Sequence, residues 1–177
     1  MAYPPHGLTA AQLAEYAPFD PETPNADKAI DAAVGYLRDK AGWHVFPSVT
    51  ETLTVDGEGG QVLTLPTLKV TAVLEVRENG VVLDPSAYEW SATGDLKRRG
   101  WMWTDRWNGI TVQLTHGYDD VPPELLRAIG SAVATAAVSP LGIPEVMGPF
   151  QFTGSGGASW IGDAADTMNR YVLPWRA

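Results

Sequence analysis

The sequence contains no cysteine, and that absence removes several classes of function at once. A chain without thiols forms no disulfide, offers no thiol nucleophile and builds no zinc–thiolate centre. No apolar run approaches the roughly 18 residues that a membrane-spanning helix needs. The first residues, Met1 to His6, show no basic segment followed by an apolar stretch, which a signal peptide requires. We therefore expect no membrane among the partners of this protein.

Positive charge is also scarce. The chain has 12 Lys and Arg residues against 21 Asp and Glu, a formal net charge of −9, and its isoelectric point is about 4.6. A general nucleic-acid binder needs a basic footprint to displace counterions from phosphates, so the charge argues against that class. It is compatible with a protein past which DNA slides without adhering, because like charges repel.

Catalytic motifs are missing as well. The three histidines have no metal-ligand spacing, and no H-E-x-x-H occurs. His116 is followed by Asp119, an arrangement that a general base with an orienting acid would show. However, the segment lies between an expected strand and an expected helix, where Gly, Asp and Pro serve as turn residues. We expect no catalytic residue, no metal site and no cofactor, with a hydrolase or lyase using His116 and Asp119 as the catalytic alternative.

A length of 177 residues suits one domain, and its periodicity predicts an α+β fold. Helices are expected near residues 9–16, 26–41 and 123–138. Thr9 and Gln12 form a capping box for the first of these helices. Asn25 is the expected N-cap of the second, and Gly42 follows its last residue as a C-terminal cap.

Between the second and third helices the hydrophobic period changes to two. Residues from about 43 to 118 form five to seven short runs of alternating character, separated by turn residues. Asn79-Gly80 is the clearest hairpin signal among them. We therefore predict a small helical bundle, built from 26–42 and 122–138, that carries an antiparallel β insertion. Together these parts form a single domain over 1–140.

The remaining residues, 141–177, differ in composition and are expected to form an extended C-terminal arm. A Gly/Ser-rich tether, residues 154–159, is flanked by large apolar side chains, which a disordered tail normally lacks. Large apolar residues beside a flexible linker indicate a segment that becomes ordered when it packs on another surface, either its own domain or a partner. The candidate partner-docking residues are Phe150, Phe152, Trp160, Ile161, Tyr171, Leu173 and Trp175.

A cluster of basic and aromatic residues lies within the β region. The run 97–107 places four basic residues, Lys97, Arg98, Arg99 and Arg106, close to three tryptophans, Trp101, Trp103 and Trp107. Such a mixture suits stacking on single strands or a phosphate contact, so the four basic residues are candidates for contact with DNA or a partner. The alternatives are a wide hairpin whose tryptophans cover the sheet, and a carbohydrate-binding module that stacks exposed tryptophans on sugars.

Two sequence runs carry a family resemblance. Leu-Pro-x-x-x-Val-Thr-x-Val begins at Leu65, and His-Gly-Tyr-Asp-x-Val-Pro begins at His116. With the stretches 29–43 and 83–90 and the order of the elements, they make residues 25–140 resemble the head-to-tail adaptor, or head-completion connector, proteins of long-tailed bacteriophages.

The resemblance implies a structural role in the virion. Such adaptors form a homo-oligomeric ring, usually of twelve copies, in the neck between capsid and tail after assembly in the host cytoplasm. The ring joins the portal protein to the next stopper or tail protein and extends the channel through which packaged DNA passes without sequence recognition. The C-terminal arm would reach the portal, and Leu126, Ile129 and Val133 of the small-residue helix would pack around the ring.

Overall fold

The computed structural model describes residues 4–138, 146–147, 150–153, 157–160 and 163–174, with side chains over 4–134 and 166–174. The chain forms two compact units. A helical unit comprises residues 1–44 and 120–177, and a β unit comprises 45–119. We predicted one domain over 1–140 followed by a separate arm. In the structure, residues 120–177 instead group with the first 44 residues. No helix in the described ranges is long and apolar enough to cross a membrane.

The helical unit is built around two long helices that pack against each other, α2 (Ala26–Ala41) and α3 (Pro123–Val138). The short helices α1 (Ala10–Ala14) and α4 (Asp163–Asn169) pack beside them. A three-stranded antiparallel sheet in the order β10-β9-β8 completes the unit, from β8 (Val146–Met147), β9 (Phe150–Thr153) and β10 (Gly157–Trp160). These strands and α4 lie where we expected only irregular structure or a tether.

Local sequence explains the ends of the helices. The capping box at α1 is present, since Thr9 Oγ1 accepts from the backbone N–H of Gln12 and the Gln12 side chain accepts from the N–H of Thr9. Gly42 adopts the left-handed conformation, φ 82°, that ends α2. Asn25 occupies the N-cap position as predicted but makes no side-chain cap. Its own φ of 68° lies in the left-handed region rather than the extended one that side-chain capping uses.

The β unit consists of two antiparallel sheets and one 3₁₀ turn. The larger sheet has the order β1-β7-β3-β4, from β1 (Val49–Val55), β7 (Ile110–His116), β3 (Val70–Glu78) and β4 (Val81–Val82). The smaller has the order β2-β6-β5, from β2 (Val62–Thr64), β6 (Asp95–Arg98) and β5 (Tyr88–Trp90), and η1 (Pro85–Ala87) precedes β5. The predicted α+β class, with helices and an antiparallel β insertion, is confirmed.

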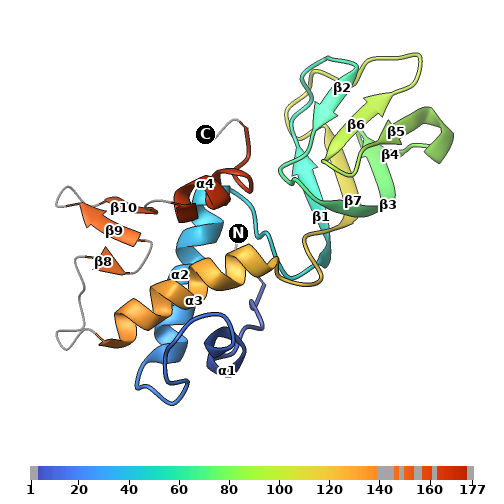
Figure 1. The fold of residues 1–177 in the computed structure, drawn as a ribbon. Helices are drawn as coiled ribbons and strands as arrows, with labels where there is room; N and C mark the ends of the chain where they lie inside the picture. The colour runs from blue at the N-terminus through green and yellow to red at the C-terminus, as the bar shows by residue number, and fades with distance from the viewer. Residues whose placement is uncertain (1–3, 139–145, 148–149, 154–156, 161–162, 175–177) are drawn as a thin grey trace. The chain divides into compact units, whose positions relative to one another are not determined.

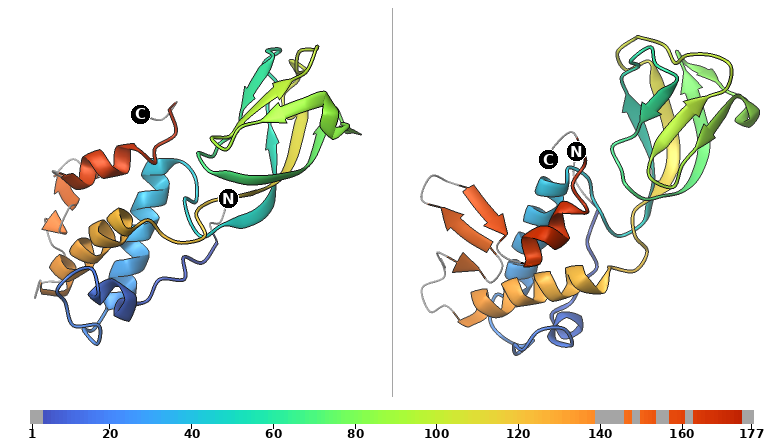
Figure 2. Two further views of the ribbon diagram at one scale, coloured as in Figure 1. Left: turned by 45° about the vertical axis from the view of Figure 1, so that its right-hand side comes forward. Right: turned by 45° about the horizontal axis from the view of Figure 1, so that its top comes forward.

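One apolar cluster joins the two sheets of the β unit. It contains buried residues from both, among them Leu53 of β1, Leu96 of β6 and Val112 of β7. The buried positions of β7 alternate with less buried ones, as expected for a strand with one face on a core. Figure 2 shows the two sheets of this unit as facing layers.

Candidate interaction surfaces

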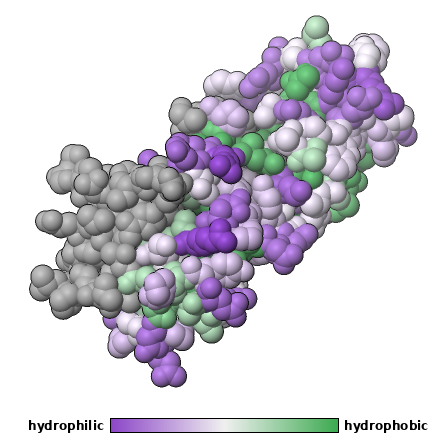
Figure 3. All heavy atoms as spheres, in the orientation of Figure 1, coloured by the Kyte–Doolittle hydropathy of each residue, from purple (hydrophilic) through white to green (hydrophobic). Residues whose placement is uncertain are grey.

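The β unit presents large apolar side chains on one loop, residues 99–109, which we call the tryptophan loop. Trp101 is 75% exposed, Met102 71% and Trp107 85%. Figure 3 shows residues of high hydropathy elsewhere on the visible surface of the β unit, but its hydropathy scale does not colour tryptophan as hydrophobic. Monomeric proteins usually keep such side chains covered, so several on one loop indicate an interaction site.

Trp103 of the same loop has the opposite environment. It is 2% exposed and belongs to the core that joins the two sheets. Its indole Nε1–H donates to the backbone oxygen of Leu96, 3.2 Å away. The tryptophans of the loop therefore have different environments. Trp103 covers the sheet, as the wide-hairpin alternative predicted, while Trp101 and Trp107 are exposed to solvent. A sugar platform that uses all three tryptophans does not exist in this structure.

Arg98 makes its contacts inside the β unit. Its Nη2 donates to Glu78 Oε2 at 2.9 Å, both side chains being largely buried, and its Nη1 donates to the oxygen of Ala87 at 3.2 Å. The guanidinium carbon lies 5.3 Å from the centre of the Trp103 ring, within cation–π range. Arg98 thus holds the base of the tryptophan loop rather than facing a ligand.

The other three basic candidates are exposed. Arg99 pairs with Glu89 at 2.8 Å in an ion pair whose two side chains are each more than half exposed, and such pairs contribute little to stability. Among the described residues no ion pair is recorded for Lys97 or Arg106. Lys97 and Arg106 are available to an acidic surface or a phosphate, and Arg99 can join them by exchanging its exposed partner Glu89.

The residues expected to pack around a ring lie on α3. Ile129 and Val133 are fully buried in the helical unit, and Leu126 is half-buried. The close approach that the small residues of this helix predicted is made by the chain itself: a Cβ on Gly130 would lie 2.9 Å from the Cβ of Ala17 and 3.3 Å from the oxygen of Leu13. Most of the apolar side of α3 therefore builds the monomer.

Two of the seven docking candidates lie in the core of the helical unit. Tyr171 is 6% exposed and Leu173 1%. The Leu173 N–H donates to the oxygen of Ala41, and the indole N–H of Trp43 donates to the oxygen of Tyr171 at 2.7 Å. This end of the chain folds back on its own unit, the alternative that the composition left open.

The other docking candidates are not described at the level of side chains. Phe150 and Phe152 belong to β9 and Trp160 ends β10, but their side chains lie outside the described part of the structure, as do Ile161 and Trp175. Their role in docking stays a prediction.

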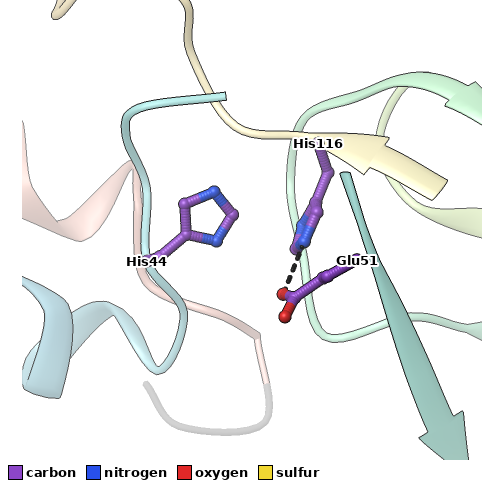
Figure 4. A group of neighbouring side chains, drawn as sticks. All are labelled: His44, Glu51 and His116. Atoms are coloured by element: carbon purple, nitrogen blue, oxygen red, sulfur yellow. Dashed lines mark hydrogen bonds and ion pairs between the residues drawn. The ribbon is translucent and has the colours of Figure 1, made fainter. Parts of the chain in front are cut away.

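His116, the candidate base, is 2% exposed at the end of β7, and its Nε2 hydrogen-bonds to Glu51 Oε1 of β1 at 2.9 Å (Figure 4). Burial lowers the pKa of His116, and the Glu51 carboxylate opposes that shift. Asp119, its expected partner, is exposed. A buried imidazole held by a cross-strand carboxylate is positioned to stabilise the sheet.

Sequence reasoning missed Glu78, whose carboxylate organises the tryptophan loop. Besides pairing with Arg98, its Oε1 accepts from the backbone N–H of Thr104 at 2.6 Å. Acidic residues that alternate with apolar ones in a strand are expected on its solvent face. Only the fold distinguishes Glu78 from Glu75, three residues earlier.

Comparison with known structures gives a full-length match. The chain aligns with a chain from the neck of the native gene transfer agent (GTA) particle determined with C12 symmetry, at TM-score 0.64 and 15% identity, covering 100% of this chain and 97% of the other. The chain shares the fold of a GTA neck protein. Chains from the neck of the empty GTA particle with C6 symmetry and from the native GTA virion match with TM-score 0.61 at the same identity and coverage. No protein-family model and no curated protein matches the sequence.

Proposed function

We propose that this protein is a structural component of the neck of a phage-like virion, where copies of it form a ring. The ring joins the portal protein to the next connector, stopper or tail protein and extends the channel for packaged DNA. The protein has no catalytic role, binds no cofactor, and assembles in the host cytoplasm before becoming part of the virion.

The observation that carries the proposal is the fold shared over the whole chain with GTA neck proteins. The alignment covers the helices and the β insertion of this chain together, so the similarity extends beyond a small common motif. The sequence resemblance to bacteriophage head-to-tail adaptors, in residues 25–140, points to the same role independently of the fold.

The symmetry of the similar particle supports a ring of twelve. The neck of the native GTA particle was determined with C12 symmetry, and adaptor rings of bacteriophages usually have twelve copies. The net charge of −9 per chain suits a ring around a channel, because an acidic wall does not bind phosphates tightly.

Portal binding is proposed for the docking candidates that are not used inside the helical unit. Tyr171 and Leu173 are buried there, which leaves Phe150, Phe152, Trp160, Ile161 and Trp175. Twelve copies of a weak contact around one axis gain avidity without any single strong contact.

A carbohydrate- or surface-binding module is the second candidate. The exposure of Trp101 and Trp107 favours it, because exposed indole rings stack on sugars. The burial of Trp103 counts against it, since only two of the three tryptophans are accessible.

Mass photometry of the purified full chain, alone and mixed with the portal protein from the same genome, tests the structural role. We expect a closed oligomer near twelve copies, or a complex with the portal at matching stoichiometry. A protein that stays monomeric at all concentrations and ignores the portal contradicts the proposal, and tryptophan fluorescence with a glycan panel then tests the second candidate.

A further inference from the structure

The tryptophan loop is held rigidly although its largest side chains are exposed. The Trp103 N–H donates to the oxygen of Gly60 at 2.8 Å, and the Gly57 N–H donates to the oxygen of Arg106 at 2.9 Å. The Asn108 N–H donates to Asp56 Oδ1 at 2.7 Å. Gly57 is required for this packing, because a Cβ there would lie 2.0 Å from the oxygen of Thr104.

A loop with this many tertiary hydrogen bonds loses little conformational entropy when it binds. Preorganised aromatic side chains are the residues that most often dominate binding energy at protein interfaces, because their ordering cost has been met during folding. Trp101, Met102 and Trp107 contribute nothing to the core from their exposed positions, so folding of the β unit does not explain them.

The charge of the loop indicates which kind of partner surface it would bind. Residues 97–107 carry four basic side chains and one acidic one in a chain whose net charge is −9. Because Arg98 is committed to Glu78, the outward cations are Lys97, Arg99 and Arg106. Such a surface favours an acidic partner, and the rest of this same protein is acidic.

One acidic surface of the helical unit is complementary. Residues 15–31 carry five acidic side chains, all exposed, and the single basic residue Lys28. An open surface hollow of about 360 Å³ lies within this segment, and its lining consists of Pro21, Glu22, Thr23, Asn25, Ala26, Asp27 and Lys28. Tyr16, which is 38% exposed, adds an aromatic ring to the same segment. With five exposed carboxylates against one lysine, the segment suits a cationic partner surface.

We propose that the tryptophan loop of one copy docks on the acidic segment 15–31 of a second copy. This inference rests on the proposed function and names the contact that closes the ring. Because two different surfaces meet, the interface is heterologous, and such contacts propagate head to tail until they close on themselves. The basic side chains steer the encounter and the exposed tryptophans supply the buried apolar area.

Charge reversal tests the contact. Arg99→Glu with Arg106→Glu is expected to raise the concentration for half-assembly, read by mass photometry, by about tenfold or more, the size of a lost hot spot. Adding Glu22→Arg and Asp27→Arg to that variant is expected to restore assembly. Trp90→Ser removes an exposed tryptophan of the β unit outside the loop and is the matched control, expected to assemble as wild type.

Cross-linking provides a second, direct test, because the chain has no cysteine and any introduced cysteine is its only thiol. A chain carrying both Trp107→Cys and Asp27→Cys, treated with a bismaleimide, should give a ladder of covalent oligomers under denaturing conditions. Each single-cysteine variant should stop at a dimer or below. A ladder from the double variant, with no specific dimer from either single variant, identifies a head-to-tail contact between these two surfaces.

Failure of the inference is distinguishable from failure of the proposed function. If wild type forms rings and the loop variants form them equally well, without a ladder, the second-copy contact is wrong while the ring stands. If the variants form normal rings that no longer bind the portal, the loop serves the portal instead. Loss of glycan binding without loss of the ring assigns the loop to a sugar. If wild type forms no oligomer with or without the portal, the proposed function itself fails.

Discussion

Tyr171 holds the end of the chain to the helical unit through two parts of the same residue. Its backbone oxygen accepts from the Trp43 indole, and its hydroxyl donates to Glu124 Oε1 at 2.7 Å, in the first turn of α3. That hydroxyl is the main reason that the pKa of Glu124 is lowered, with the helix backbone N–H next. One side chain thus links the segment after α4 to α3.

Replacing Tyr171 by Phe is expected to lower the free energy of unfolding by about 1 kcal/mol at neutral pH, through loss of that hydrogen bond. Because the folded pKa of Glu124 lies below its unfolded value, the stabilisation is present above about pH 4.3 and is lost as pH falls through the folded pKa. The difference between wild type and variant should therefore shrink in acid.

Urea unfolding of both proteins across that pH range, with the Glu124 pKa followed by NMR, measures this effect. Tyr16→Phe is the control, since Tyr16 is partly exposed and no partner is recorded for its hydroxyl among the described residues. An unchanged Glu124 pKa in Tyr171→Phe contradicts the assignment.

At the scale of elements, two helical glycines have opposite roles. Gly35, in the middle of α2, is exposed, and a Cβ there would meet nothing within 4 Å. Gly130, in the middle of α3, is buried where the Leu13 to Ala17 segment crosses it, with contacts too close for a Cβ. Sequence propensity treats both as equal defects in a helix.

Alanine at these two positions is expected to change stability in opposite directions. Gly35→Ala should stabilise the helical unit by about 0.5–1 kcal/mol through reduced backbone entropy in the unfolded chain. Gly130→Ala should destabilise it, on the order of 1 kcal/mol net, because the α1 segment must move away. Thermal unfolding monitored by helical circular dichroism distinguishes them, and a stabilised Gly130→Ala variant would show that α1 does not pack there.

The whole molecule has two units, and the β unit has the properties of an independent one. Its core draws only on residues 53–114. Its ends meet, since the Tyr118 N–H donates to the oxygen of Val45 at 2.9 Å and Val49 pairs with His116. A segment whose ends lie together can be removed or inserted without stretching the chain that carries it.

The excised segment 45–119 is therefore expected to fold alone, giving dispersed amide resonances and a cooperative thermal transition. Leu96→Ala in the excised segment should lower its stability by about 2–5 kcal/mol, as for a fully buried leucine. A segment that lacks chemical-shift dispersion would mean that the β unit depends on the helical unit for its structure.

By itself the sequence determined the α+β class, the two long helices and nearly every strand of the β unit. Those features follow from local rules: a 3.6-residue period ending at Gly42, a two-residue period, and the turn at Asn79-Gly80. It also determined the absence of thiol chemistry and the acidic charge.

Only the tertiary structure decided which apolar and charged side chains are used inside the chain. Trp103 and Trp107 lie four residues apart in one basic, aromatic run, yet one is 2% exposed and the other 85%. Tyr171 and Leu173 resembled free anchors until Ala41, Trp43 and Glu124 were brought beside them from distant positions. Burial depends on partners that are remote in sequence, and no local period or composition specifies them.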